Sequence, residues 1–315
     1  MIKIPKVKKR EEIKGIRFGL CCLNTELREK HKIFASHTVR LATVEKEGID
    51  CLIKCGRINC KHLLELIEWN EKNGIKVLRL SSELFPHYTN PKSPVKYSLE
   101  LFDSELKQVG DLAKEYGHRL TFRPGQYNVL ATPNEKFLSK TIDELKMHAE
   151  IFDRMGVGRD SVMVIHAGGF YKDKNATKKR WAKRYLELPD NIRSRLVLEN
   201  CEKAFSIEDC LEVNLLCGVP IVFDNLHFDC YVKMHPSEDF LSPEKYIPYV
   251  LKTWGSIRPK FHISEQAVGE RIGKHADYIN TIPSYYLDIY EKYGVEIDVM
   301  VEAKMKEKAI MRLMN

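Results

Sequence analysis

Short runs of aliphatic and β-branched residues recur along the chain, and several of them end in a histidine or a carboxylate. The stretch 195–227 shows this most clearly, because RLVLE (195–199) and PIVFD (220–224) enclose a more polar segment. This pattern predicts strand, helix, strand, with Glu199 closing the first strand and Asp224 the second. A carboxylate at the end of a buried strand contributes nothing to core packing. We therefore interpret both strand ends as parts of a site.

The same pattern predicts eight strands, separated by segments with helical spacing. The predicted strands are 16–22, 76–82, 119–127, 161–169, 195–199, 220–224, 260–264 and 296–303. The predicted helices are 60–73, 104–116, 135–155, a segment containing Trp181 and Tyr185, one starting at Ser206, 246–254 and 283–293. Several of these helices stop at a glycine, which is a common signal at helix C-termini. The stretch before residue 58 has weak periodicity, and 228–243 is interpreted as a long excursion.

Eight strands alternating with helices predict a single (β/α)8 TIM barrel, an α/β fold with its site at the C-terminal ends of the strands. We expect this domain to span 15–315 and to follow a basic N-terminal tail, 1–14. An open doubly wound sheet is the alternative fold.

Composition restricts the class of protein. The chain has 315 residues, of which 43% are hydrophobic and 30% charged, and it has no apolar stretch long enough to span a bilayer. The N-terminus lacks the apolar core of a secretory signal. Nine scattered cysteines indicate reduced thiols, and the grouping Cys51, Cys55 and Cys60 does not match a zinc knuckle. We expect a cytoplasmic protein, nuclear if the source is eukaryotic, that is monomeric and uses no nucleotide cofactor.

The formal charge of +7 is consistent with a polyanionic partner. Basic residues crowd into 3–10 and 172–184, and the second run follows directly on the strand that ends in His166. Lys178, Lys179 and Arg180 in this run are candidates for contacts to a phosphate backbone. The alternative is that the run is only a solvated helix face.

Five strand ends carry the residues that define the candidate site. Their side chains are those of His166, Glu199, Asp224, His262 and Glu302. In the last two strands the polar residues alternate with aliphatic ones, so the polar set faces the barrel lumen. Carboxylates and imidazoles without a thiolate suit Mn²⁺, Zn²⁺ or Fe²⁺. His227 and His275 are candidates for a further metal ligand or a phosphate contact.

Such a cluster supports two kinds of chemistry. It can stabilise charge on a phosphoryl oxygen during phosphodiester hydrolysis, or it can polarise a sugar carbonyl for isomerisation or epimerisation. The basic segments favour the first, since a small-sugar enzyme has no need of them. The sequence contains no Walker A loop, no dinucleotide fingerprint and no G-x-S-x-G elbow.

An ordered set of motifs resembles the UV damage endonuclease family, which is related to the endonuclease IV barrels. The motifs are RLSSELFP, FRPGQY, HAGG, LEN, FDNLH, KFHISEQ, GKHAD and VMVEAKMKEKAI, and they cover nearly everything from residue 16 onward. The resemblance implies a metal-dependent hydrolase that nicks damaged double-stranded DNA on the 5′ side of lesions such as pyrimidine dimers. A non-cleaving, lesion-binding relative is a further hypothesis.

The resemblance also implies roles for individual residues. It implies two or three divalent ions per chain, with Mn²⁺ favoured and Zn²⁺ or Mg²⁺ as alternatives. The implied metal ligands are His166, Glu199, Asp224, His227, His262, His275 and Glu302. Glu199, Lys260 and Glu302 would serve catalysis, and Asn24, Gln126 and Tyr127 would touch the DNA at the lesion.

Four positions depart from the family pattern. Arg123 and Asn90 stand where the family has histidines, Leu20 where a tyrosine is common, and Phe228 where a second histidine often follows the first. Arginine cannot ligate a metal. We therefore predict one metal fewer than in the three-metal relatives, with Arg123 holding a substrate phosphate or a cluster carboxylate instead. His87 is the only nearby candidate for a substitute ligand.

Overall fold

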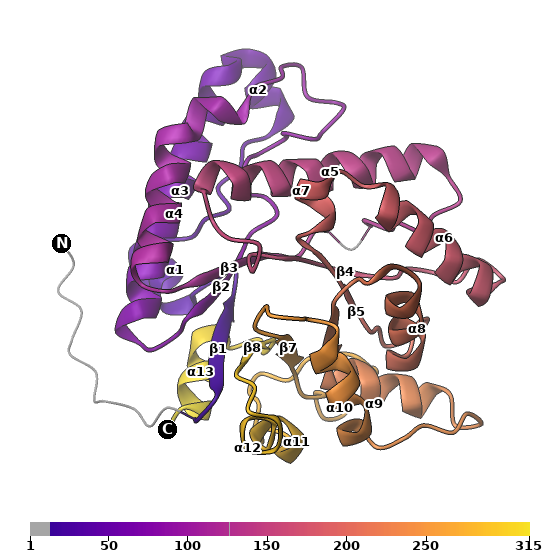
Figure 1. The fold of residues 1–315 in the computed structure, drawn as a ribbon. Helices are drawn as coiled ribbons and strands as arrows, with labels where there is room; N and C mark the ends of the chain where they lie inside the picture. The colour runs from indigo at the N-terminus through magenta and orange to yellow at the C-terminus, as the bar shows by residue number, and fades with distance from the viewer. Residues whose placement is uncertain (1–12, 126) are drawn as a thin grey trace.

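The computed structural model describes residues 13–125 and 127–315. Within these residues, parallel strands follow one another around a closed barrel in chain order, and β8 pairs back with β1 (Figure 1). The eight strands are β1 (Ile16–Cys21), β2 (Val77–Leu80), β3 (Arg119–Phe122), β4 (Met163–His166), β5 (Leu196–Glu199), β6 (Ile221–Asp224), β7 (Lys260–Ile263) and β8 (Ile297–Val301). The predicted (β/α)8 barrel is confirmed, and the open sheet is excluded.

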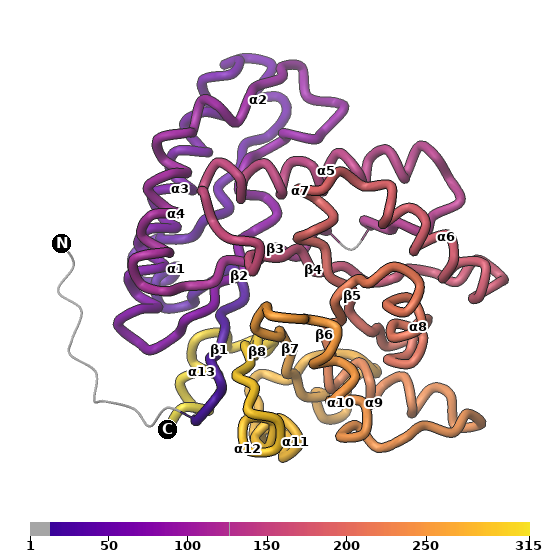
Figure 2. The backbone as a smooth tube through the Cα atoms, viewed as in Figure 1, coloured from indigo at the N-terminus to yellow at the C-terminus, as the bar shows by residue number. Residues whose placement is uncertain are grey.

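Helices surround this ring, and the backbone trace shows them following the strands in turn (Figure 2). In the first half of the barrel they are α1 (Thr25–His31), α2 (Leu41–Glu47), α3 (Ile49–Lys72), the 3-10 helix η1 (Leu99–Phe102), α4 (Asp103–Glu115) and α5 (Glu135–Met155). In the second half they are α6 (Lys174–Glu187), α7 (Asp190–Arg193), α8 (Ile207–Cys217), α9 (Asn225–Met234), α10 (Pro243–Lys252), α11 (Ser284–Leu287), α12 (Ile289–Tyr293) and α13 (Lys306–Leu313).

Three helix predictions are corrected. The helix expected at 60–73 begins at Ile49, because its first turns bury Cys51, Leu52 and Cys55 against the core. The polar residues between these three weaken the helical periodicity in the sequence. The expected excursion after residue 227 contains α9, which begins at Asn225 and is capped by the Asp224 side chain. The single helix expected at 283–293 is two short ones, α11 and α12.

The strands are buried on both faces, as expected where helices cover the outside of a parallel sheet. In β6, Ile221 and Phe223 join the layer between barrel and helices, whereas Val222 packs in the lumen with the valines of neighbouring strands. Gly19 of β1 also faces the lumen, where a Cβ would lie 2.8 Å from the Met300 Cε. Glycine at this position therefore leaves room for the methionine that fills the barrel centre.

An ion network is buried at the N-terminal end of the barrel. Asp298 of β8 is fully buried, and both of its oxygens are paired. Arg17 Nε donates to Oδ1 at 2.7 Å, and Arg119 NH1 donates to Oδ2 at 2.9 Å. Burial would raise the pKa of Asp298, but Arg119 and Arg17 hold it below its usual range. The Arg119 guanidinium also lies over the Trp254 ring, 5.3 Å from its centroid.

Two expectations from composition can be compared with the structure. In the described part of the chain all cysteines are free thiols, in agreement with the prediction of reduced cysteines. None of the helices in the described ranges is both long and apolar enough to cross a membrane.

Candidate metal centre at the barrel mouth

Four of the predicted ligands are brought together by the strand register. His166 lies opposite Glu199 at the ends of β4 and β5, and Asp224 lies opposite His262 at the ends of β6 and β7. Glu302 follows directly after β8. Since parallel strands end on the same rim, these side chains converge on the C-terminal mouth of the barrel, as the sequence predicts.

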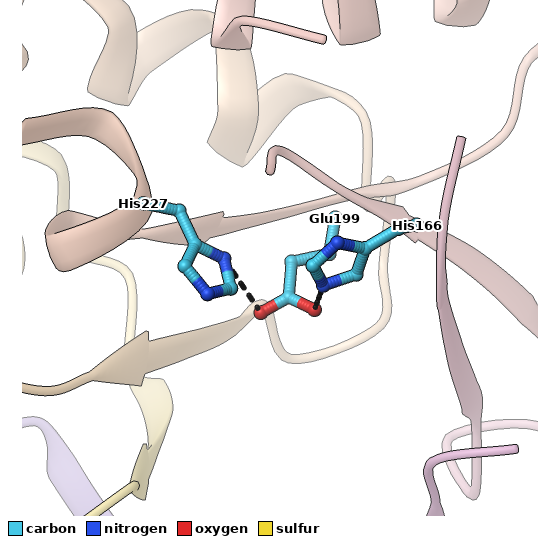
Figure 3. A group of neighbouring side chains, drawn as sticks. All are labelled: His166, Glu199 and His227. Carbon is cyan, nitrogen blue, oxygen red and sulfur yellow. Dashed lines mark ion pairs between the residues drawn. The ribbon is translucent and has the colours of Figure 1, made fainter. Parts of the chain in front are cut away.

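Glu199 is the centre of the group. Its carboxylate is fully buried, and His166 and His227 approach different oxygens of it (Figure 3). His166 Nε2 lies 2.8 Å from Oε2, whereas on Oε1 His262 Nδ1 lies at 2.6 Å and His227 Nδ1 at 3.6 Å. Burial alone would raise the pKa of Glu199, but Arg123, His262 and His166 hold it well below its usual range. The carboxylate is therefore anionic and ready to act as a ligand.

Asp224 supplies the observation that tests whether a metal fits. Its Oδ1 caps helix α9 by accepting the backbone N–H of His227 at 2.9 Å. Its Oδ2 is buried and accepts no hydrogen bond among the described residues, and His262 Nδ1 is 3.9 Å away. A buried carboxylate oxygen without a partner is costly. A divalent cation would supply the missing partner.

Two groups of three side chains can each offer ligand atoms that lie within 4.8 Å of one another. One group is His166, Glu199 and His227, and the other is Glu199, Asp224 and His262. Both groups contain Glu199, whose Oε1 lies nearest His262 and His227 and whose Oε2 lies nearest His166. The donor types, imidazole nitrogen and carboxylate oxygen, would suit divalent transition-metal ions.

Hydrogen bonds orient the imidazoles of this centre. His227 Nδ1 lies 3.0 Å from the Asn200 carbonyl, which leaves Nε2 free for a ligand. His262 Nε2 lies 2.9 Å from Lys260 Nζ. Burial lowers the pKa of Lys260 to about 7, helped by the nearby Arg79, and burial together with Lys260 lowers the pKa of His262 to about 4. A neutral His262 can then donate from Nε2 to a neutral Lys260, which leaves Nδ1, on the side of Glu199 and Asp224, as the nitrogen for a ligand.

Arg123 reaches the cluster from the end of β3. Its NH1 donates to Glu199 Oε2 at 2.5 Å and lies 3.6 Å from Glu302 Oε1, and its NH2 contacts His166 Nε2. The guanidinium thus pairs with cluster carboxylates, one of the two roles expected for it. His87 does not replace the missing ligand, because one ring nitrogen binds the Val39 carbonyl at 2.8 Å and the other lies 3.1 Å from the Asn90 side chain.

Two residues of the centre are not among those predicted from the sequence. Arg79, at the mouth end of β2, pairs with Glu302 Oε1 at 2.5 Å. Despite burial of the carboxylate, Arg79 and Arg123 hold the pKa of Glu302 well below its usual range. An arginine in the apolar run VLRL was the signal for this residue. Cys201, two residues after Glu199, lines the same pocket as His166, so a thiol is present where only imidazoles and carboxylates were expected. No periodic signal marks it, because it lies beyond the strand.

The remaining ligand candidate, His275, and the predicted lesion residues differ in position and in burial. His275 belongs to the loop after β7, where it forms an isolated bridge with Gln266, and it is in neither ligand group of the described residues. Asn24 is fully buried and caps α1, with its Oδ1 accepting from Leu27 N at 2.9 Å. Tyr127 is 84% exposed at the mouth. Gln126 lies outside the described residues.

The basic run is only partly available to a ligand. Lys178 is buried in α6, where its Nζ lies 3.2 Å from Asp209 Oδ1 and also pairs with Glu212, both on α8. Its assignment as a phosphate contact is corrected, because helix α6 packs on α8 through this side chain. Arg180 donates to the Ala131 carbonyl at 2.7 Å, which ties α6 to the loop before α5. Lys179 is exposed.

A pocket of about 470 Å³ opens beside the centre. It is lined on one side by Arg123, His166 and His227, and on the other by Glu202 and Gly273. The pocket gives a substrate direct access to ligand atoms that are themselves largely buried.

Comparison with known proteins agrees with this geometry. A family model described as UV-endonuclease UvdE matches residues 16–315. The chain belongs to the UV-damage endonuclease family. It is 35% identical over 303 residues to a protein named putative UV-damage endonuclease from Acanthamoeba polyphaga mimivirus, covering 95% of this chain and 90% of that protein. It is 36% identical to the UV-damage endonuclease of Schizosaccharomyces pombe over 94% of this chain, which spans only 50% of the yeast protein.

Solved structures place the family fold in a wider group. The crystal structure of SacUVDE matches with a TM-score of 0.79 and 31% identity, covering 94% of this chain and 96% of that one. Endonuclease IV from Thermus thermophilus matches with a TM-score of 0.55 and 13% identity, covering 94% of this chain and 96% of that one. The second match shows a shared fold alone.

Proposed function

We propose that this protein is a metal-dependent DNA repair endonuclease that hydrolyses the phosphodiester on the 5′ side of UV lesions such as pyrimidine dimers. The observation that carries the proposal is the pair of ligand groups that share Glu199, one of which contains the Asp224 oxygen without a hydrogen-bond partner. Membership of the UV-damage endonuclease family supports the substrate, because the relatives bear that name. The proposed partner is therefore damaged double-stranded DNA.

The proposed ions are two per chain, held by His166, Glu199 and His227 on one side and by Glu199, Asp224 and His262 on the other. When bound, they would stabilise the charge that develops on the phosphoryl oxygens during hydrolysis. The donor set suits Mn²⁺ first, with Zn²⁺ or Mg²⁺ as alternatives. His275 remains a proposed ligand.

The chain's own residues supply positioning and charge. Arg123 and Arg79 hold the carboxylates of Glu199 and Glu302 in place from the β2–β3 side of the mouth. A phosphate entering the pocket would meet the Arg123 guanidinium, whose side chain is 26% exposed. Lys260 and Glu302 are proposed to serve catalysis beside Glu199, with Lys260 Nζ fixing the ring of His262.

Asn24 and Tyr127 are proposed lesion contacts of different kinds. Tyr127 is free to stack on a base. Asn24 is buried, so its contribution would be to hold the start of α1 at the mouth. We further propose that the protein acts as a monomer in the cytoplasm, or in the nucleus of a eukaryotic host.

A sugar isomerase or epimerase is the less favoured alternative. Sugar epimerases such as D-psicose 3-epimerase from Clostridium cellulolyticum share the fold, with a TM-score of 0.50, but only 15% identity. The family match and the exposed cation Lys179 favour a nucleic-acid substrate instead.

One assay separates the three hypotheses. The protein is incubated with Mn²⁺ and a duplex that carries a single pyrimidine dimer, next to a Glu199→Gln variant. We expect a nick immediately 5′ of the dimer by the wild type, and loss of nicking by about a hundredfold or more in the variant with DNA affinity within a few fold. Binding without a nick would indicate a lesion-binding protein. Neither binding nor nicking would reject the proposal in favour of the sugar enzyme.

A further inference from the structure

The loop after β7 forms a tight hairpin next to the metal centre. Residues 265–276 fold back on themselves, with Ala267 N donating to the Lys274 carbonyl at 2.8 Å and Ala276 N to the Glu265 carbonyl at 2.7 Å. The Gln266 side chain fills the turn, accepting from Gly273 N at 2.8 Å and donating to the Arg271 carbonyl at 3.0 Å. The hairpin is therefore ordered before any ligand binds.

The tip of this hairpin is apolar and solvated. Val268 is 100% exposed and Ile272 is 46% exposed, and Gly269 has a φ of +73° that allows the tight turn between them. Isolated exposed apolar residues are common on protein surfaces. Here, however, two of them lie on one rigid hairpin whose base, Gly273, lines the pocket beside His166 and His227.

The hairpin stands across the mouth from Tyr127. The loop carrying Tyr127 follows β3, and the hairpin follows β7, so the two lie four strands apart in a closed ring of eight. Strands four apart are diametrically opposed. The metal centre between them is thus flanked by an exposed aromatic side chain on one side and an exposed apolar tip on the other.

The positive charge of the exposed turn favours a nucleic acid as the partner that binds this tip. Glu270 is paired with Lys274 at 2.6 Å, which leaves the neighbouring Arg271 as the excess charge of the exposed turn. An apolar tip beside a cation is the combination that groove-binding proteins use, in which an apolar side chain enters between base steps and a basic one meets the backbone. Because the hairpin is already ordered, little conformational entropy would be lost on binding.

We propose that the hairpin 265–276 is a second DNA-contacting element, with Val268 entering a groove of the duplex on the side of the metal centre opposite Tyr127. This inference rests on the proposed function, since it requires DNA across the mouth. A distorted duplex opens more readily than an intact one, so Val268 contributes more to binding of damaged than of undamaged DNA.

The test compares Val268→Ser with a matched control, Leu215→Ser. Leu215 is 85% exposed on the outer helix α8, so both variants remove one solvated aliphatic side chain without touching the core. Affinity is measured by fluorescence anisotropy on a duplex with one pyrimidine dimer and on the same duplex undamaged. We expect Val268→Ser to weaken binding of the damaged duplex about fivefold and of the undamaged one less than twofold. Val268→Leu should retain wild-type affinity, and Leu215→Ser should change neither value.

The outcomes keep this inference distinct from the proposed function. If Val268→Ser binds both duplexes like the wild type, the hairpin assignment is wrong even when the protein nicks at the dimer. If the wild type binds the damaged duplex but does not nick it, the proposed activity fails while the affinity comparison still decides the hairpin. If the wild type binds neither duplex, both fall.

Discussion

The two ends of the barrel each bury an aspartate at the lumen, and their environments are opposite. At the N-terminal end Asp298 accepts from two arginines, so that both oxygens are paired. At the C-terminal end Asp224 uses one oxygen as a helix cap and leaves the other without a hydrogen bond. Both side chains are fully buried. At one end the chain itself pairs both carboxylate oxygens, whereas at the other it leaves one oxygen for the proposed cation.

This contrast explains why charged residues occupy a barrel interior at all. Burial of an unpaired charge costs several kcal/mol, so a buried carboxylate needs either a cation from the protein or one from solution. At the N-terminal end the protein itself supplies the cations. At the mouth Arg79 and Arg123 pair with Glu302 and Glu199, but no side chain of the described residues hydrogen-bonds Asp224 Oδ2, where a cation from solution would fit.

The largest expected effect is a loss of stability when the ion network around Asp298 is broken. Asp298→Asn removes the charge that compensates Arg119, whose guanidinium is almost fully buried. We expect the free energy of unfolding to fall by about 3–5 kcal/mol, since one partner of a buried pair is left uncompensated. Urea unfolding followed by circular dichroism measures this. The fraction that stays folded should nick at the wild-type rate, and a selective loss of nicking with unchanged stability would contradict the structural role.

The matched change at the mouth should have the opposite effects, with stability retained and nicking lost. Asp224→Asn keeps an oxygen for the cap of α9 and removes a charge that has no partner, so the metal-free protein should unfold within about 1 kcal/mol of the wild type. Nicking should fall about a hundredfold or more, because a ligand is lost. A stability loss as large as that of Asp298→Asn would show that Asp224 is structural and that the contrast between the two ends is wrong.

Much of this arrangement could be predicted from the sequence. The strand ends at His166, Glu199 and Asp224 follow from aliphatic runs that stop at a polar residue, and the alternation in β7 and β8 gives the luminal face. The paired end could not be predicted, because Arg17, Arg119 and Asp298 are far apart in the chain and only the barrel register brings them together. Lys178 was misassigned for a similar reason: a charge run does not reveal which of its members faces a neighbouring helix.

Tyr127→Ala tests the aromatic side of the mouth. The ring is 84% exposed, so its removal should leave thermal stability unchanged. We expect the ratio of affinities for damaged and undamaged duplex to fall by about tenfold, since base–aromatic stacking contributes roughly 1–3 kcal/mol. Competition binding between the two duplexes measures the ratio. A lower melting temperature with the ratio intact would assign the ring to packing.

The smallest expected effect is a loss of DNA affinity, and it should distinguish Lys179 from its neighbour Lys178. Lys179→Ala should weaken binding to damaged and undamaged DNA alike, by about two- to threefold, and should lower the salt slope by about one. Lys178→Ala is the control, because its ammonium pairs with Asp209 and Glu212. It should lower stability without changing the salt slope. If Lys178→Ala changes the slope and Lys179→Ala does not, the assignment of the two residues is reversed.

The central claim, that the mouth is completed by ions and the other end by the chain, is tested most directly by counting metals. The purified protein is saturated with Mn²⁺, freed of excess and analysed for tightly held ions. We predict two ions per chain for the wild type, since there are two ligand groups and the cation Arg123 pairs with Glu199 and Glu302, and a gain of one ion for Arg123→His. Asp298→Asn should keep two ions, and Asp224→Asn should lose one. Three ions in the wild type, or an unchanged count in Asp224→Asn, would contradict the account.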